Sequence, residues 1–288
     1  MRKIKNISTP YLFLFPALIG LLLFKIYPII SAFIQSLFKM EFLNGVEKFV
    51  GLGNYLSLFS DPVFWNSIKV TLWFNLLINP LQIILAFGLA ILLNSKIKKI
   101  AFFRGINFIP VAVSIPTACI LWEIMLSPEQ GVVNSILVSL NMSPQPFLTD
   151  SSQALESIIA ISSWRGIGYW ALFFLAGLQE LPKSLYEAAA IDGANRWRQF
   201  INITYPMMKR TLTFVAVAVT VANMLLFSPM YILTGGGPQQ STNVLMVESY
   251  NSAFLYSDMG RASSIVVIIL LITLVVIGFQ FKFFRAKH

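Results

Sequence analysis

Charged residues are scarce in this chain of 288 residues. They make up 11% of the sequence, whereas about 25% is usual for a soluble domain. Hydrophobic residues make up 57%, and the mean hydropathy is +0.74. One core cannot hide so many apolar side chains, so the composition argues against a water-soluble fold.

Cysteine and histidine are almost missing. Cys119 is the single cysteine and His288 the single histidine. These counts exclude an internal disulfide framework, a cysteine-built metal site and a histidine-based triad. We therefore expect neither a metalloenzyme nor a serine hydrolase.

The formal net charge of +9 raises the possibility of nucleic-acid binding. The basic residues, however, form short clusters between long apolar segments. That distribution is typical of a protein that crosses the bilayer several times, so we expect a lipid environment and no nucleic acid.

Six apolar segments are long enough to cross the bilayer, since a span needs about 20 residues for roughly 30 Å of hydrocarbon. We predict an all-α membrane protein with a single transmembrane domain, residues 1–288. The first segment is too long for a signal-peptide core and lacks a small-residue cleavage site, so we expect a retained helix. The predicted spans are 11–37, 70–93, 105–126, 157–178, 211–233 and 262–281.

Lysine and arginine are unevenly divided between the two sides of these spans. The N-terminus, the loops after spans two and four and the C-terminal tail hold fifteen, and the opposite loops hold four. The positive-inside rule therefore predicts a multi-pass protein of the cell membrane with both termini in the cytoplasm.

The loop 181–210 is the most informative segment. Pro182 in a first turn and Ser184 as a cap predict the start of a helix, and Asp192-Gly193 predicts its end. A second short helix is expected over 195–203. Two interpretations stay open here: a docking element for a cytoplasmic partner, or a plain surface helix-turn-helix.

The loops on the opposite side are less distinctive. Between spans one and two, Gly51-Leu52-Gly53-Asn54-Tyr55 and Asp61-Pro62-Val63-Phe64-Trp65 predict an interfacial loop with a short amphipathic helix. The stretch 127–150 holds three prolines and no basic residue, so we expect an irregular connection.

The loop 181–210 also resembles the EAA loop of ABC importer permeases. The matching positions are Glu187-Ala188-Ala189, Asp192-Gly193-Ala194, Phe200, Ile203 and Pro206. A second match is Leu233-Thr234-Gly235-Gly236-Gly237-Pro238 with Ser241-Thr242, Leu245 and Tyr250, which is similar to the carbohydrate subfamily with its maltose-, multiple-sugar- and glycerol-phosphate-type permeases. Arg210 and Tyr205 depart from the family pattern at the start of span five.

The resemblance implies a type I ABC importer permease fold, with a coupling helix that docks in a groove of a separate ATPase. The coupling residues would be Glu187, Ala188, Ala189, Asp192 and Gly193. The sequence has no P-loop, and indeed no Gly-Lys pair, so ATP and Mg would be bound by the partner ATPase and no cofactor by this chain. The implied partners are a second, non-identical permease, two cytoplasmic ATPase subunits and an external sugar-binding protein. The chain itself would catalyse no covalent chemistry.

The sugar path is expected near the bilayer midplane, because polar residues inside a membrane usually face a cavity or the bundle interior. The resemblance assigns pocket positions to Gly166, Tyr169 and Asn223, with close helix packing as the alternative for Gly166. For Arg165 three roles stay open: contact with substrate, pairing with a partner subunit, or snorkelling outward. The full set of candidates is Ser162, Arg165, Gly166, Tyr169, Thr220 and Asn223.

Two alternatives to a sugar importer remain. An ion-coupled secondary transporter would need an intramembrane Asp or Glu, and the uncharged spans two, five and six argue against it. A glycerol-phosphate-type permease would bind an anion, which needs more cationic groups than Arg165. We therefore favour a neutral oligosaccharide as substrate.

Overall fold

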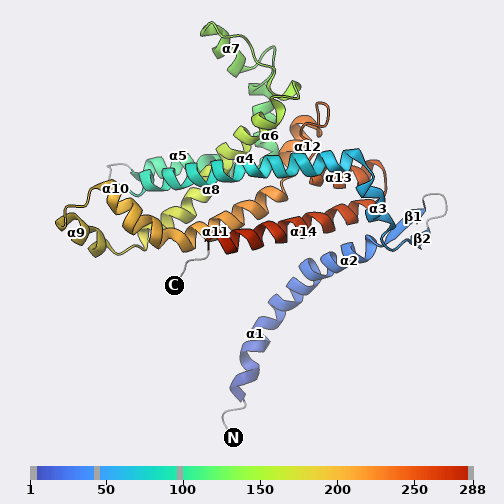
Figure 1. Ribbon diagram of the computed structural model, residues 1–288, viewed down its shortest axis with the longest axis horizontal. Helices are drawn as coiled ribbons and strands as arrows, with labels where there is room; N and C mark the ends of the chain where they lie inside the picture. The colour runs from blue at the N-terminus through green and yellow to red at the C-terminus, as the bar shows by residue number, and fades with distance from the viewer. Residues whose placement is uncertain (1–4, 42–45, 96–99, 285–288) are drawn as a thin grey trace. The chain divides into compact units, whose positions relative to one another are not determined.

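The computed structural model describes residues 5–41, 46–95 and 100–284, and most of them are helical. Their contacts divide the chain into two compact units. One comprises residues 1–64 and 248–270, and the other residues 65–247 and 271–288. The helices are labelled in Figure 1.

The first unit begins with a long apolar helical run, which a small hairpin follows. The run consists of α1 (Lys5–Leu21), a π-helical turn (Leu22–Ile26) and α2 (Tyr27–Gln35). Over Phe13–Gln35 none of its most apolar stretch is buried against protein, as suits a helix whose sides face lipid or another chain. The antiparallel strands β1 (Phe38–Glu41) and β2 (Val46–Phe49) follow, in a loop for which no strand was predicted.

The Gly-Leu-Gly-Asn-Tyr stretch anchors a short helix, α3 (Gly53–Phe59), to the end of α2. The side-chain amide of Asn54 donates to the carbonyl oxygens of Ser36 at 2.8 Å and Phe38 at 2.9 Å. The Tyr55 hydroxyl donates to Ser36 Oγ at 2.7 Å. The short helix expected in this loop is therefore present.

The second unit is a helical bundle built around α8 (Ala154–Gln179), which packs against α5 (Ile100–Ala112) and α11 (Tyr205–Met224). The helix α12 (Ser228–Thr234) packs against both α6 (Ile115–Met125) and α8. Three helices have residues in both units, because the boundaries between the units fall inside them. They are α4 (Pro62–Leu93), α13 (Leu245–Tyr250) and α14 (Met259–Phe284).

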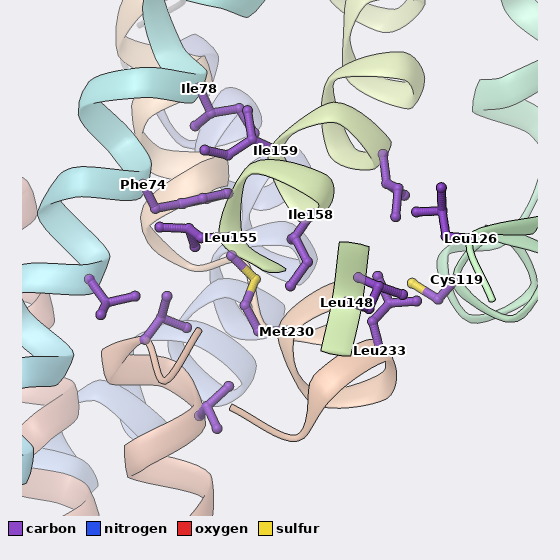
Figure 2. Close-up of a cluster of buried hydrophobic side chains, with 14 residues drawn as sticks. Phe74, Ile78, Cys119, Leu126, Leu148, Leu155, Ile158, Ile159, Met230 and Leu233 are labelled. Carbon is purple, nitrogen blue, oxygen red and sulfur yellow. The ribbon is translucent and has the colours of Figure 1, made fainter. Parts of the chain in front are cut away.

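Two apolar clusters hold this bundle together. The first contains Phe74 of α4, Ile158 of α8 and Met230 of α12, whose side chains pack in one buried cluster (Figure 2). In the second, Phe87 and Phe174 lie with ring centroids 5.1 Å apart. Lipid is as apolar as these side chains, so close packing, and not removal from the solvent, stabilises such contacts.

Five helical runs of the described residues are long and apolar enough to cross a membrane, and a bent pair makes a sixth if it counts as one span. That pair, α5 and α6, corrects the prediction of one continuous span over 105–126, because the two helices meet at 94°. Ser114 is extended there, and its side chain caps α6 by accepting from the Thr117 N–H. Pro116 has no N–H to donate to the Ala112 carbonyl, so the first helix cannot continue.

The fifth predicted span, 211–233, is also interrupted. The helix α11 ends at Met224 and α12 begins at Ser228. Pro229 follows at the second position of α12 and supplies no N–H to the Leu225 carbonyl, so the chain breaks at 225–227.

The stretch 127–150 is more ordered than the irregular connection that was expected. It contains α7 (Val132–Ser139) and a 3-10 turn (Phe147–Thr149). Asn134 is buried and holds the stretch closed, since its side chain donates to the Gln145 carbonyl at 2.9 Å and accepts from the Gln145 N–H at 2.8 Å. The three prolines predicted an irregular connection. They gave no indication of the hydrogen bonds between the Asn134 side chain and the Gln145 backbone.

Candidate functional site

A network of neutral polar side chains links three long helices of the second unit. The side-chain amide of Asn223 on α11 donates to Asn79 Oδ1 at 2.7 Å and to Gln82 Oε1 at 3.1 Å, both on α4. Thr220, one turn before Asn223, accepts from Asn79 at 3.3 Å and from Gln280 of α14 at 2.6 Å. The three helices are therefore joined by side-chain hydrogen bonds in their apolar stretches.

Most of this network is shielded from solvent. Thr220 is 0% exposed, Gln82 2% and Asn223 7%. A polar group inside a bilayer is costly unless it is paired, and here the carboxamides and the hydroxyl pair with one another. Among the described residues, the hydrogen bonds that define the network involve no charged group.

Gln82 connects the network to α8. Its side-chain amide donates to the Ser162 carbonyl at 3.2 Å. A Cβ atom added to Gly166 would lie 2.5 Å from Gln82 Nε2, so glycine is needed for this approach. The Ser162 hydroxyl is buried and has no hydrogen-bond partner among the described residues. The structure thus brings together four residues predicted from sequence: Ser162, Gly166, Thr220 and Asn223.

Arg165 and Tyr169 lie outside these hydrogen bonds. Tyr169 is 42% exposed, and its ring packs against Trp170 and Phe173. Arg165 Nε donates to the Val113 carbonyl at 3.4 Å. Val113 lies in the break between α5 and α6, so the hydrogen bond matches a structural role for Arg165.

Three members of the network, Asn79, Gln82 and Gln280, were missed by the sequence analysis. They lie in predicted spans two and six, for which no candidate residue was named. The available signal was a carboxamide within an otherwise apolar run, which is as informative inside a membrane as a charge would be.

A groove of about 760 Å³ adjoins the network on α4, α11 and α14. That volume lies within the roughly 300–1,000 Å³ typical of small-molecule sites. Asn79 and Gln280 provide carboxamides to its wall, Trp65 and Trp73 provide indole rings, and Lys69 provides a cation. Such a wall offers ring faces and hydrogen-bonding groups side by side.

The segment predicted to couple to a partner is a helix followed by a sharp turn. The helix α9 (Lys183–Ile191) begins after Pro182, whose extended conformation makes it the N-cap. Ser184 lies inside the helix, so its prediction as the cap is wrong. Asp192 ends the helix and Gly193 has φ +77°, as a left-handed turn requires.

A second short helix, α10 (Arg196–Gln199), follows this turn as expected. Asn195 caps it, since its side chain accepts from the Arg198 N–H at 2.9 Å. The Tyr186 hydroxyl and Thr204 Oγ1 lie 2.9 Å apart and tie α9 to the π-helical turn (Phe200–Thr204) that leads into α11.

Large apolar side chains are exposed on both α9 and α10. No residue of α9 is buried, and Ile191 is 87% and Trp197 67% exposed. Glu187, Ala188 and Asp192 are exposed as well, and Ala189 is half-buried. Exposed apolar side chains of this size are common on surfaces that contact another protein.

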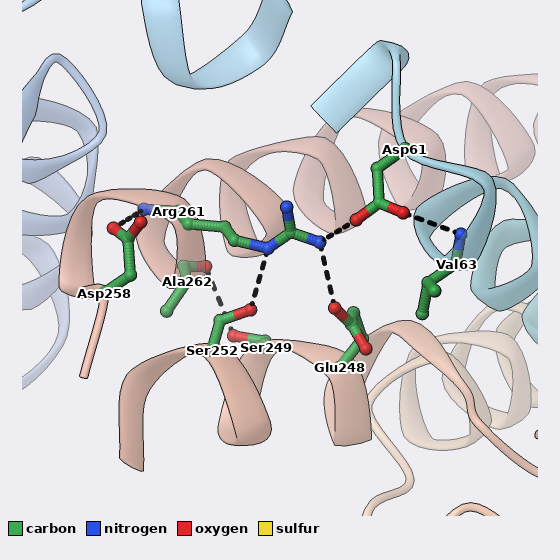
Figure 3. Close-up of polar contacts among 8 residues, drawn as sticks. All are labelled: Asp61, Val63, Glu248, Ser249, Ser252, Asp258, Arg261 and Ala262. Carbon is green, nitrogen blue, oxygen red and sulfur yellow. Dashed lines mark hydrogen bonds and ion pairs between the residues drawn. The ribbon is translucent and has the colours of Figure 1, made fainter. Parts of the chain in front are cut away.

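An ionic cluster in the first unit was not predicted either. The Arg261 guanidinium lies between Asp61, to which it is paired, and Glu248, at 3.0 Å (Figure 3). Its Nε donates to Ser252 Oγ at 3.2 Å. Burial raises the pKa of Asp61, but the Arg261 pairing and the Val63 N–H outweigh it and hold that pKa below its usual value.

Comparison with known proteins identifies the family. Residues 6–286 match the family described as binding-protein-dependent transport system inner membrane component. The probable ABC transporter permease protein YurN of Bacillus subtilis is 38% identical over 98% of this chain and 97% of its own. The sn-glycerol-3-phosphate permease protein UgpA of Agrobacterium fabrum is 35% identical over 98% and 96%. The arabinooligosaccharides permease protein AraP of Bacillus subtilis is 36% identical over 93% and 86%.

A crystal structure of a bacterial ABC transporter for the acidic polysaccharide alginate has the same fold. It superposes with a TM-score of 0.86 at 24% identity, over 99% of this chain and 97% of that one. The likeness confirms the type I permease fold that the sequence predicted. The chain therefore belongs to the binding-protein-dependent transport system inner membrane components, and it is a membrane-embedded permease subunit of an ABC importer, not an enzyme.

Proposed function

We propose that this permease forms part of the translocation path for a neutral oligosaccharide. The observation that carries the proposal is the groove beside the network of Asn79, Thr220 and Asn223. The polar groups of this network are carboxamides and one hydroxyl. Sugars bind through ring faces on aromatic side chains and through hydroxyls paired with such groups. The similarity to AraP supports the same substrate class.

Coupling to ATP would run through α9. Its exposed Glu187 and Ala188, the half-buried Ala189, and the turn at Asp192 and Gly193 form the part of the described chain suited to a cytoplasmic groove. ATP and Mg would be bound by that partner. We propose two such ATPase subunits, a second permease that is not identical to this one, and a sugar-binding protein on the outer side, with both termini of this chain in the cytoplasm.

Transport would proceed by alternating access. Movement of α9 on a closing ATPase would shift α10 and α11, because Tyr186 ties α9 to the start of α11. Asn223 and Thr220 lie at the other end of α11, so the same shift would reach the hydrogen bonds to α4 and α14. The network would then alter its pairing as the path opens and closes.

A glycerol-phosphate-type substrate is the second candidate, because UgpA is nearly as similar as AraP. A phosphate would need cationic groups, and Lys69 supplies one at the groove wall. It lies ten residues before Asn79 on α4, about 15 Å along the helix from the network. This separation favours the neutral substrate.

The test is a tagged purification from native membranes in mild detergent, with the bound chains identified by mass spectrometry. A P-loop ATPase and a second permease that appear together support the proposal, and their ATPase activity is then measured with the binding protein and candidate sugars. Stimulation by a neutral sugar and not by a phosphodiester supports the substrate class, and the reverse result refutes it. A chain that purifies alone and moves solute into ATP-free liposomes would support the ion-coupled alternative.

A further inference from the structure

A second hollow, of about 350 Å³, lies at the Ala154 end of α8. Its wall comes from α6, the 3-10 turn at 147–149 and the first two turns of α8. The helix α8 has 26 residues and spans about 39 Å, so this hollow lies at the end of the helix remote from α9. None of its lining residues belongs to the network around Asn223.

Two aromatic side chains face the hollow, and both are held firmly. The Trp122 ring packs edge-to-face on Trp164, with centroids 5.6 Å apart. Phe147 adopts φ +44°, in the left-handed region that a bulky side chain rarely occupies. The Gln153 side chain accepts from the Phe147 N–H at 3.2 Å, and the neighbouring Leu148 is buried in the core shown in Figure 2.

Strain of this kind persists only where the surroundings over-determine the backbone, and it gathers at binding sites. Here the result is that the backbone carrying an aromatic side chain is held in place beside the hollow. Gln153, which holds it, is itself fixed by a hydrogen bond from its Nε2 to Gln145 Oε1 at 2.9 Å. The hollow is therefore preorganised.

Most of the lining is apolar, and its few polar groups are neutral or negative. Gln153, Glu156 and Ser157 contribute an amide, an exposed carboxylate and a hydroxyl, and none of the described residues that line the hollow is basic. A carboxylate repels phosphates and acidic sugars but accepts hydrogen bonds from neutral hydroxyls. Rigid aromatic faces beside such acceptors suit a pyranose or furanose ring.

We propose that this hollow is a sugar subsite that holds one ring of a neutral oligosaccharide at the end of the permease remote from α9. Trp122 and Phe147 supply the ring faces, and Glu156 accepts from the sugar hydroxyls. The inference rests on the proposed sugar transport. It adds a site that the sugar would contact before it reaches the groove on α4.

The experiment uses the assembled importer in lipid nanodiscs, without binding protein and without glycoside detergent. Saturation-transfer NMR measures binding of maltotriose, cellotriose, raffinose and arabinotriose. We compare Trp122→Leu and Glu156→Gln with the matched control Glu123→Gln, since Glu123 is an exposed glutamate beside Trp122 that does not line the hollow. Size-exclusion chromatography confirms that each variant assembles.

We expect one of the four sugars to bind, about tenfold more weakly to Trp122→Leu and about threefold more weakly to Glu156→Gln, with the Glu123→Gln importer unchanged. In ATP-driven uptake, Trp122→Leu should raise KM by a similar factor with little change in kcat. No sugar bound by the wild type, or equal binding by assembled Trp122→Leu, overturns the subsite. If the Trp122→Leu importer takes up sugar with the wild-type KM, the subsite is wrong but the proposed sugar transport stands. If the wild-type importer takes up no sugar with ATP, the proposed function is refuted.

Discussion

The turn that ends α9 offers a direct test of coupling. Gly193 has φ +77°, and a Cβ atom added there would meet nothing within 4 Å. A substitution therefore acts through the backbone alone and not through a clash. The left-handed conformation costs an L-residue about 1–2 kcal/mol, and more for a β-branched one. A cost of that size lowers the population of the native turn by a factor of about 5–30.

We predict that Gly193→Val abolishes most of the sugar-stimulated ATPase activity of the assembled importer. Gly193→Ala should be intermediate, and Gly193→Asn should keep most of the activity because asparagine tolerates this conformation. Gly88→Val is the matched control, since Gly88 also has open space around it but lies inside helix α4. Stimulation of Gly193→Val at the wild-type level, in a complex that assembles normally, would refute the coupling role of this turn.

Three further predictions concern the network, the bundle and the ionic cluster. Asn223→Ala leaves two carboxamide oxygens without their donor, at a cost of about 2 kcal/mol, so uptake should fall while the complex still assembles; unchanged uptake kinetics would remove Asn223 from the site. Gly168→Ala places a Cβ within 3 Å of the Asn107 carbonyl, and such overpacking costs about 1–3 kcal/mol, so the Tm should fall by several degrees in a thermal scan. Asp61→Asn should lower the Tm more at pH 7 than near pH 3: although burial raises the pKa of Asp61, its pairing with Arg261 holds that pKa below the usual value, so the stabilisation is complete above the usual value and is lost as the pH falls through the lowered pKa. An equal loss of Tm at both pH values would contradict the ionic account.

The helix α9 and its turn could be predicted from sequence because their causes are local. The alanine run favours a helix, Asp192-Gly193 ends it, and Asn195 caps the next one. Even here the first residue was misassigned. Ser184 can cap a helix, but the extended backbone of Pro182 starts this one two residues earlier.

The site was harder to predict because its causes are not local. Asn223 and Gln82 are 141 residues apart in sequence, and only the packing of α11 on α4 brings them together. Gly166 is the clearest case, since both interpretations of it, substrate contact and close packing, depend on what approaches the helix. The structure shows that the approaching group is the Gln82 carboxamide.

The bend at Ser114 was missed for a related reason. Pro110 lies within α5 and does not end it, whereas Pro116 lies at the second position of α6, just beyond the break. Proline alone does not distinguish these outcomes. Arg165, which donates to the Val113 carbonyl at this bend, shows how a distant side chain can satisfy a broken helix.

The most direct test of the account is uptake by the purified importer in proteoliposomes, with ATP enclosed and the binding protein on the other side. The account predicts accumulation of a neutral oligosaccharide that requires both ATP and the binding protein and persists when ionophores collapse the H⁺ and Na⁺ gradients. Uptake that proceeds without ATP and stops when those gradients collapse would contradict it.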